Sequence, residues 1–318
     1  MGMEGAGTDP VTKTLRPNRR VVNSLVWSLD RFRMLGSNNP DLVAGGDVFL
    51  GEVRSKDGTA IAFERSGEGP PVVLVVGAFN DRATGAPLAA ALQERFTVFN
   101  YDRRGRGDSG DTPPYAVERE VEDLEALIEE AGGSASVFGY SSGAVLALRA
   151  AARGLAITRL ALYDPPVSAD GGAGRLREDL AARVAGLVEE GRRGDAVELF
   201  QTEAVNLPAE VVAQIRRAPF WPALEAMAHT LVYESEILGN GSLPTELAAS
   251  VEAPTLVIVG GESHPYLREK APALADVMPV ARARVLEDQG HDLVPRVLAP
   301  VLEEFLADRY DGPDRAGR

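Results

Sequence analysis

Short, mostly apolar segments alternate with helical patterns along the first half of the chain, and this alternation constrains the fold more than any other feature. The apolar segments are Pro71–Val76, Phe96–Tyr101, Ala135–Gly139 and Ile157–Tyr163. A strand that lacks alternating polar residues is typical of a parallel sheet covered on both faces. The segments between these strands have the spacing of amphipathic helices. The pattern therefore predicts an α/β fold with a doubly wound, mostly parallel sheet.

Further strands and helices extend this core at both ends. Pro300 is suited to the first position of the last helix. The other segments predicted for the core are the strands Val48–Arg54, Thr59–Arg65, Pro254–Val259 and Arg282–Leu286 and the helices Arg82–Arg95, Val117–Ile128, Ser142–Arg153 and Pro300–Asp308.

An all-helical insertion is expected within this core, at residues 169–250. Its helical patterns cover Leu176–Glu190, Asp195–Val205, Ala209–Arg217 and Trp221–Leu238. The core itself would then comprise residues 47–168 and 251–310. Residues 1–46 form an N-terminal extension in which apolar residues from Val21 to Phe32 predict one amphipathic helix. Residues 311–318 are a C-terminal tail.

Several classes of function are disfavoured by composition. The chain of 318 residues has no cysteine and three histidines, which removes thiolate chemistry and argues against a histidine-rich metal centre. Its formal net charge of −14 would repel nucleic acid. No segment is long and apolar enough to span a membrane, and no secretory signal is evident. We expect a cytoplasmic protein that acts on a small molecule, with a homo-oligomer possible.

The pentapeptide Gly139-Tyr140-Ser141-Ser142-Gly143 matches the pattern G-x-S-x-G. It lies where a predicted apolar strand ends and an alanine-rich helix begins. At such a turn the serine adopts a strained backbone, and the flanking glycines allow other chain segments to approach closely. The hydroxyl of Ser141 would then project at the edge of the sheet beside a helix N-terminus, which favours developing negative charge. The motif predicts a nucleophilic serine.

The stretch Gly105–Gly110 fits the dinucleotide pattern G-x-G-x-x-G, yet Pro113 and Pro114 follow it where a helix should begin. We interpret it instead as part of a rigid loop, Asp102-Arg103-Arg104-Gly105-Arg106-Gly107-Asp108-Ser109. No nucleotide, flavin or metal cofactor is expected.

Three motifs follow one another along the chain: the arginine- and glycine-rich loop, the serine pentapeptide, and Gly290-His291-Asp292 after the last predicted strand. In this order the chain resembles the α/β-hydrolase family, in its single-domain form with a helical cap, over residues 47–310. The resemblance implies that His291 is the general base for Ser141. It also implies that the insertion is the cap, with Phe200, Phe220, Trp221, Met227 and Leu231 as either pocket or cap-core residues.

The acidic partner of His291 departs from the family pattern. The family usually places an Asp after the strand predicted here at Pro254–Val259, but Glu262 is the acidic residue in that loop. The alternative is Asp164, after the strand Ile157–Tyr163, where Pro165 should keep it extended. We favour Asp164 and keep Glu262 as the alternative.

The resemblance also implies an oxyanion hole and a reaction class. Its backbone donors would be the N–H groups of Ser142 and Ala78, with Phe79 as a substitute for Ala78. The expected activity is that of a serine esterase, cleaving a small uncharged or weakly polar ester, thioester or lactone through an acyl-enzyme. The alternatives are a biosynthetic cyclase or perhydrolase and a ligand-binding protein without catalysis.

Overall fold

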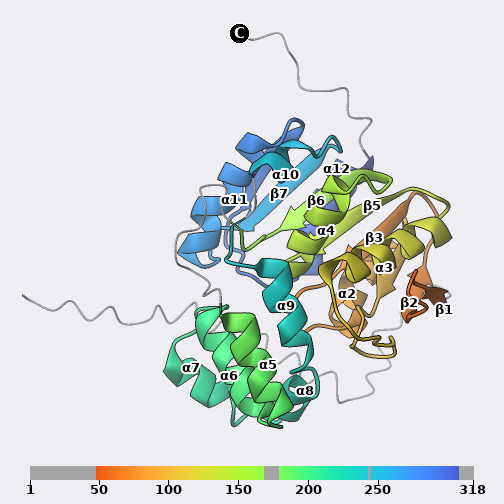
Figure 1. Ribbon diagram of the computed structural model, residues 1–318. Coiled ribbons are helices and arrows are strands. Elements are labelled where there is room, and N and C mark those ends of the chain that lie inside the picture. The colour runs from red at the N-terminus through yellow and green to blue at the C-terminus, as the bar shows by residue number, and fades with distance from the viewer. Residues whose placement is uncertain (1–47, 168–178, 243–244, 308–318) are drawn as a thin grey trace, which may run out of the picture.

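A central β-sheet organises the computed structural model, which describes residues 48–167, 179–242 and 245–307 (Figure 1). The order of the strands across the sheet is 1-2-4-3-5-6-7-8. The strands are β1 (Phe49–Arg54), β2 (Ala60–Ser66), β3 (Pro71–Val75), β4 (Thr97–Tyr101), β5 (Ala135–Tyr140), β6 (Ile157–Tyr163), β7 (Thr255–Gly260) and β8 (Ala281–Leu286).

The strands from β4 to β8 in this order pair in parallel, whereas β1–β2 and β2–β4 are antiparallel. Both faces of the parallel strands are covered. In β3, Val73 and Val75 pack into one buried cluster while Val72 and Leu74 pack into a second one on the other face. This double burial explains why these segments are mostly apolar, and it confirms the doubly wound α/β fold.

Helices cover the two faces unequally. Residues of α2 (Arg82–Leu92) and α12 (Pro295–Ala307) belong to one buried cluster, and residues of α3 (Val117–Glu130), α4 (Ser142–Ala152) and α11 (Pro265–Val277) belong to the other. Because the parallel strands end at one edge, the loops that follow β3, β5, β6 and β8 meet there.

Six helices lie among the described residues between β6 and β7. The helices α5 to α8 gather at one end of the molecule, and α9 extends from them toward α4 (Figure 1). The helices are α5 (Leu180–Glu189), α6 (Arg193–Glu203), α7 (Ala209–Ile215), α8 (Trp221–Ala226), α9 (Thr230–Leu238) and α10 (Thr245–Ala249).

Some predicted elements differ from the structure. The predicted helix Trp221–Leu238 is two helices, because the chain turns between Ala226 and Thr230. Pro300 was expected to begin the last helix, but Pro295 begins it and Pro300 lies inside. The helix α11 was not predicted. The predicted N-terminal helix lies outside the described residues, as does the start of the helix predicted from Leu176.

Candidate active site

Ser141 lies on a sharp turn between β5 and α4. Its backbone has φ 56° and ψ −126°, in the left-handed half of conformational space that a non-glycine residue rarely adopts. The neighbouring glycines are needed for packing. A Cβ on Gly139 would lie 2.5 Å from Cα of Ala144, and one on Gly143 would lie 2.3 Å from the carbonyl oxygen of Val75. The surrounding structure thus imposes the strained turn that the pentapeptide predicted.

A chain of two contacts joins Ser141 to a histidine and an aspartate. Nε2 of His291 lies 3.2 Å from Oγ of Ser141, and its Nδ1 lies 2.8 Å from Oδ2 of Asp164. The three residues come from the ends of β5 and β6 and from the loop after β8. They are separated by up to 150 positions in the sequence and meet at one edge of the sheet. This is the geometry that a serine nucleophile, a base and an orienting acid require.

Asp164 is fully buried, and its carboxylate is held by several donors. Oδ1 accepts a hydrogen bond from the backbone N–H of Gly260 at 3.0 Å, and Oδ2 accepts one from the hydroxyl of Ser263 at 2.6 Å. Its backbone φ is 49°, so the expectation that Pro165 keeps it extended is wrong. These donors fix the carboxylate in front of Nδ1 of His291.

Glu262 lies between those two donors, in the loop after β7. Its backbone N–H donates to the carbonyl of Gln289 at 2.7 Å, while the contact to Nδ1 of His291 is made by Asp164. The end of β7 and the loop after it therefore support the carboxylate of Asp164, and the acid that contacts His291 is Asp164.

The loop after β3 runs beside the serine turn. The backbone N–H of Ala78 donates to Oγ of Ser142 at 2.9 Å, so the two residues predicted to provide oxyanion donors are adjacent in space. Phe79 follows with φ 60°, another left-handed non-glycine residue. Its ring meets that of Phe200 from α6 edge-on, with the ring centroids 5.7 Å apart. The inserted helices thus touch the candidate oxyanion loop directly.

The other residues proposed for the cap pocket have different surroundings. Trp221 is buried, and its indole N–H donates to Glu225 of its own helix at 2.7 Å. Leu231 is buried in the same cluster as Phe200, whereas Phe220 and Met227 are partly exposed. Trp221 and Leu231 therefore belong to the packed interior of the inserted helices, the second of the two roles considered for them.

The two remaining histidines do not belong to this contact chain. His229 precedes α9, with Nδ1 3.1 Å from a guanidinium nitrogen of Arg193 and Nε2 3.8 Å from Asp111. His264 caps α11, where Nδ1 accepts from the backbone N–H of Tyr266 at 3.2 Å. Both serve as local contacts at the starts of helices.

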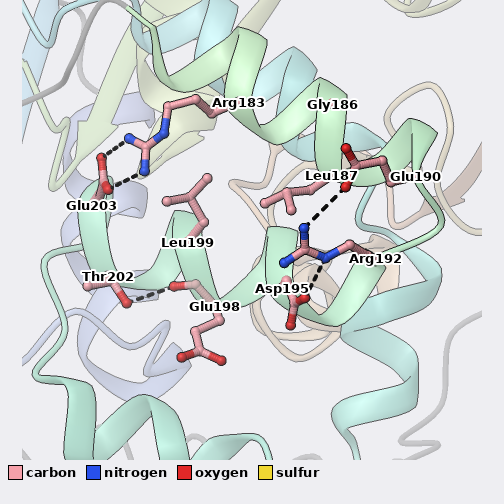
Figure 2. Close-up of a pocket in the computed structure, with 10 residues that line it drawn as sticks. All are labelled: Arg183, Gly186, Leu187, Glu190, Arg192, Asp195, Glu198, Leu199, Thr202 and Glu203. Carbon is pink, nitrogen blue, oxygen red and sulfur yellow. Dashed lines mark hydrogen bonds and ion pairs between the residues drawn. The ribbon is translucent and has the colours of Figure 1, made fainter.

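A cavity of about 650 Å³ lies apart from these residues, between α5 and α6 (Figure 2). Charged side chains at its rim pair with one another, as Arg183 does with Glu203 and Arg192 with Asp195. Ser141, Asp164 and His291 are not among its lining residues.

Sequence reasoning missed a buried ionic cluster beside the site. Arg103 and Arg106 of the loop after β4 are both buried, and both pair with Glu234 of α9. Three arginines directly after an apolar strand signal that acidic partners must be present, because an unpaired buried charge is costly. The signal does not identify Glu234, which lies 131 positions from Arg103.

Known proteins match most of the length of this chain. A model of the alpha/beta hydrolase family matches residues 72–303, a span that contains Ser141, Asp164 and His291. An α/β hydrolase from Sphaerobacter thermophilus is 56% identical, with a TM-score of 0.76; the match covers 80% of this chain and 100% of that one.

Two more distant solved structures share the fold. A thermophilic esterase from Thermogutta terrifontis is 27% identical with a TM-score of 0.58, over 81% of this chain and 97% of that one. An enol-lactonase from Burkholderia xenovorans is 24% identical with a TM-score of 0.58, over 81% of this chain and 100% of that one. In the part of the chain that the structure describes, no helix has the length and hydropathy that crossing a membrane requires.

Proposed function

The chain belongs to the α/β-hydrolase family, and on that premise we propose that it is a serine hydrolase of small, uncharged or weakly polar esters, thioesters or lactones. The family and its esterase relative make the chain a hydrolase. The observation that carries the finer proposal is the pair of contacts through His291, 3.2 Å to Ser141 and 2.8 Å to Asp164.

The proposed reaction has two stages. Nε2 of His291 takes the proton of Ser141 as Oγ attacks the acyl carbon, and the leaving alcohol or thiol then receives that proton. Water, deprotonated by the same nitrogen, hydrolyses the acyl-enzyme and regenerates Ser141. Asp164 keeps the Nδ1 proton in place and stabilises the imidazolium that forms in each stage.

The negative oxygen of each tetrahedral intermediate needs hydrogen-bond donors. The backbone N–H groups of Ala78 and Ser142 are the proposed pair. In the structure Oγ of Ser142 accepts the N–H of Ala78, so a substrate oxygen would replace that hydroxyl as the acceptor. A donor of this kind is worth about 3 kcal/mol to the transition state.

The inserted helices are the proposed cap. The edge-on contact between Phe79 and Phe200 supports this role, because it brings α6 onto the oxyanion loop. Apolar side chains at this contact suit the uncharged acyl group that we propose for the substrate.

A fluorophosphonate probe tests the proposal directly, because it reacts with an activated serine. We expect covalent labelling at Ser141, located by mass spectrometry of the digested protein, and hydrolysis of p-nitrophenyl esters from acetate to decanoate. Ser141→Ala should lose both labelling and turnover. The matched control Ser136→Ala removes a hydroxyl of β5, which lies 2.9 Å from that of Thr158, and should retain both. A wild-type protein that is inert to the probe and to every ester contradicts the proposal.

A further inference from the structure

One carboxylate from the inserted helices reaches the inside of the core. Glu234 of α9 is fully buried, and its Oε1 accepts hydrogen bonds from two guanidinium groups. Nη1 of Arg103 lies 2.7 Å away, and Nη2 of Arg106 is in closer contact. A single oxygen atom thus joins two cationic side chains of the loop after β4.

The same two arginines hold the candidate oxyanion loop. Nη1 of Arg103 donates to the carbonyl of Val76 at 3.2 Å. Nη1 of Arg106 donates to the carbonyl of Gly77 at 2.7 Å and to that of Asn80 at 3.1 Å. These three carbonyls lie on both sides of Ala78, so the arginines fix the path of the backbone that presents the Ala78 N–H.

The negative charge of Glu234 is needed to keep both arginines in place. Arg103 has a second acidic partner, because Glu120 accepts from its Nε and Nη2 at 2.7 and 2.8 Å. Among the described contacts, Arg106 forms its ion pair with Glu234. Burial opposes ionisation of Glu234, but the charges of Arg103 and Arg106 outweigh it and lower the pKa of the carboxyl. A neutral residue there would leave Arg103 paired with Glu120 but would remove the acidic partner of the buried Arg106, beside the charge of Arg103.

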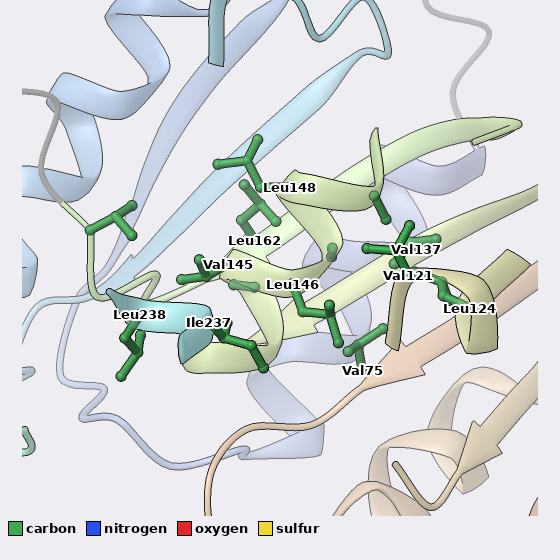
Figure 3. Packing of buried hydrophobic residues seen from close by; sticks show 14 of the residues in the cluster. Val75, Val121, Leu124, Val137, Val145, Leu146, Leu148, Leu162, Ile237 and Leu238 are labelled. Atoms are coloured by element: carbon green, nitrogen blue, oxygen red, sulfur yellow. The ribbon is translucent and has the colours of Figure 1, made fainter. Parts of the chain in front are cut away.

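The position of Glu234 is set by the packing of α9. Ile237 and Leu238 at the end of this helix are buried in the cluster that covers β3 and β5 (Figure 3). One turn earlier, the hydroxyl of Tyr233 donates to Asp111 at 2.7 Å. Contacts on either side of Glu234 therefore fix α9 against the core, and they hold the carboxylate beside Arg103 and Arg106.

We propose that Glu234 is a positioning residue for the oxyanion hole. From the inserted helices it fixes Arg103 and Arg106, and through them it sets the orientation of the Ala78 N–H toward the acyl oxygen. The inference rests on the proposed serine-hydrolase function and adds to it a specific link between the cap and the catalytic geometry.

The test is Glu234→Gln, which keeps the size and one acceptor oxygen but removes the charge. With p-nitrophenyl butyrate we expect kcat to fall by about tenfold to a hundredfold, less than the full loss of an oxyanion donor. KM should stay within about threefold, because the loop acts on the transition state rather than on the bound ester. The rate of fluorophosphonate labelling should fall by the same factor as kcat, since the phosphoryl oxygen occupies the same hole.

The matched control is Asp123→Asn. Asp123 is also a buried carboxylate that pairs with an arginine of the same loop, Arg104, at 2.6 and 2.8 Å. The contacts of Arg104 go to Asp57 and to the carbonyl of Arg119 rather than to the oxyanion loop. This variant should lose thermal stability as Glu234→Gln does, while its kcat stays within about threefold of wild type.

Equal loss of kcat in the two variants would overturn the inference, as would a wild-type kcat in Glu234→Gln. If Glu234→Gln does not fold, the comparison is repeated with Arg106→Lys and its control Arg104→Lys. A lysine at position 106 cannot reach Glu234 and the carbonyls of Gly77 and Asn80 at once, so kcat should fall in Arg106→Lys only. Failure of the proposed function has a different signature, since wild-type protein would then show neither labelling nor turnover.

Discussion

At the scale of single residues, the site depends on two neighbouring strands. Tyr140 of β5 and Tyr163 of β6 are register partners, so Ser141 and Asp164 follow at equivalent points of adjacent parallel strands. The backbone N–H of Ser141 donates to the carbonyl of Tyr163 at 2.9 Å and ties the two ends together. The placement of the acid relative to the serine is therefore set by the sheet itself.

The role of Asp164 can be tested by removing its charge alone. Asp164→Asn keeps the size of the side chain but can hold His291 in the wrong tautomer and cannot stabilise the imidazolium. We expect kcat for p-nitrophenyl butyrate to fall by a factor on the order of 10⁴. KM should change little, since His291 and Asp164 act on the proton and not on ester binding.

The matched control is Glu262→Gln, in the neighbouring loop. Its kcat should stay within about tenfold of wild type, the effect of roughly 1.4 kcal/mol on the barrier. A collapse of kcat in Glu262→Gln with normal activity in Asp164→Asn would assign the acid to the loop after β7. Normal activity in both variants would leave a pair formed by Ser141 and His291 alone.

The residues of the contact chain were predicted from the sequence. Ser141 was predicted from a local pentapeptide, whereas His291 and Asp164 were predicted from the resemblance to the α/β-hydrolase family together with their places after predicted strands. The φ of 49° at Asp164 and the role of Glu234 were not predictable in this way. Each depends on partners that lie more than ninety positions away along the chain, such as Ser263 for Asp164.

At the scale of elements, the core was more predictable than the inserted helices. Strands buried on both faces are rich in apolar residues, and this pattern can be recognised in the sequence whatever the length of the loops between them. The break between α8 and α9 has no Gly or Pro to mark it: the chain turns at Met227 and Ala228, where tertiary packing decides. The helix α11 was missed for the opposite reason. It contains Pro272, and a proline in the sequence argues against a helix interior.

The start of α9 is predicted to make stability depend on pH. Burial lowers the pKa of His229; the charge of Arg193 adds to this effect and that of Asp111 opposes it. A lowered pKa means that the folded state holds His229 neutral while the unfolded chain still binds a proton. The contribution is therefore fully present above the unfolded pKa of about 6.5 and is lost as the pH falls from there through the lower pKa of the folded state.

His229→Gln removes this titration. Thermal unfolding midpoints of both proteins, measured from pH 8 to pH 5.5, should show the wild type losing more stability than the variant. Parallel curves would show that His229 does not titrate in this range, and a steeper curve for the variant would reverse the sign of the effect.

At the scale of the whole molecule, the sheet, the inserted helices and the candidate site all lie within residues 48–307. The Sphaerobacter thermophilus hydrolase is matched over 100% of its length by 80% of this chain. We therefore expect a chain that lacks residues 1–46 to keep kcat for p-nitrophenyl butyrate within about twofold, with near-ultraviolet circular dichroism as the check on folding. A large loss of kcat in a folded, truncated protein would place part of the N-terminal extension at the site.

The contact between Ser263 and Asp164 has an evolutionary consequence. The Ser263 hydroxyl lies 2.6 Å from the very oxygen that meets His291, so a carboxylate at position 263 would enter the same small volume. A lineage that moved its acid from one strand end to the next would pass through one of two ancestors. Either it carried both carboxylates, which at such a distance must share one proton, or it carried neither and relied on an unsupported imidazole. Both ancestors would be poorer catalysts than the protein with Asp164 alone, so this contact opposes a move of the acid from the end of β6 to the end of β7.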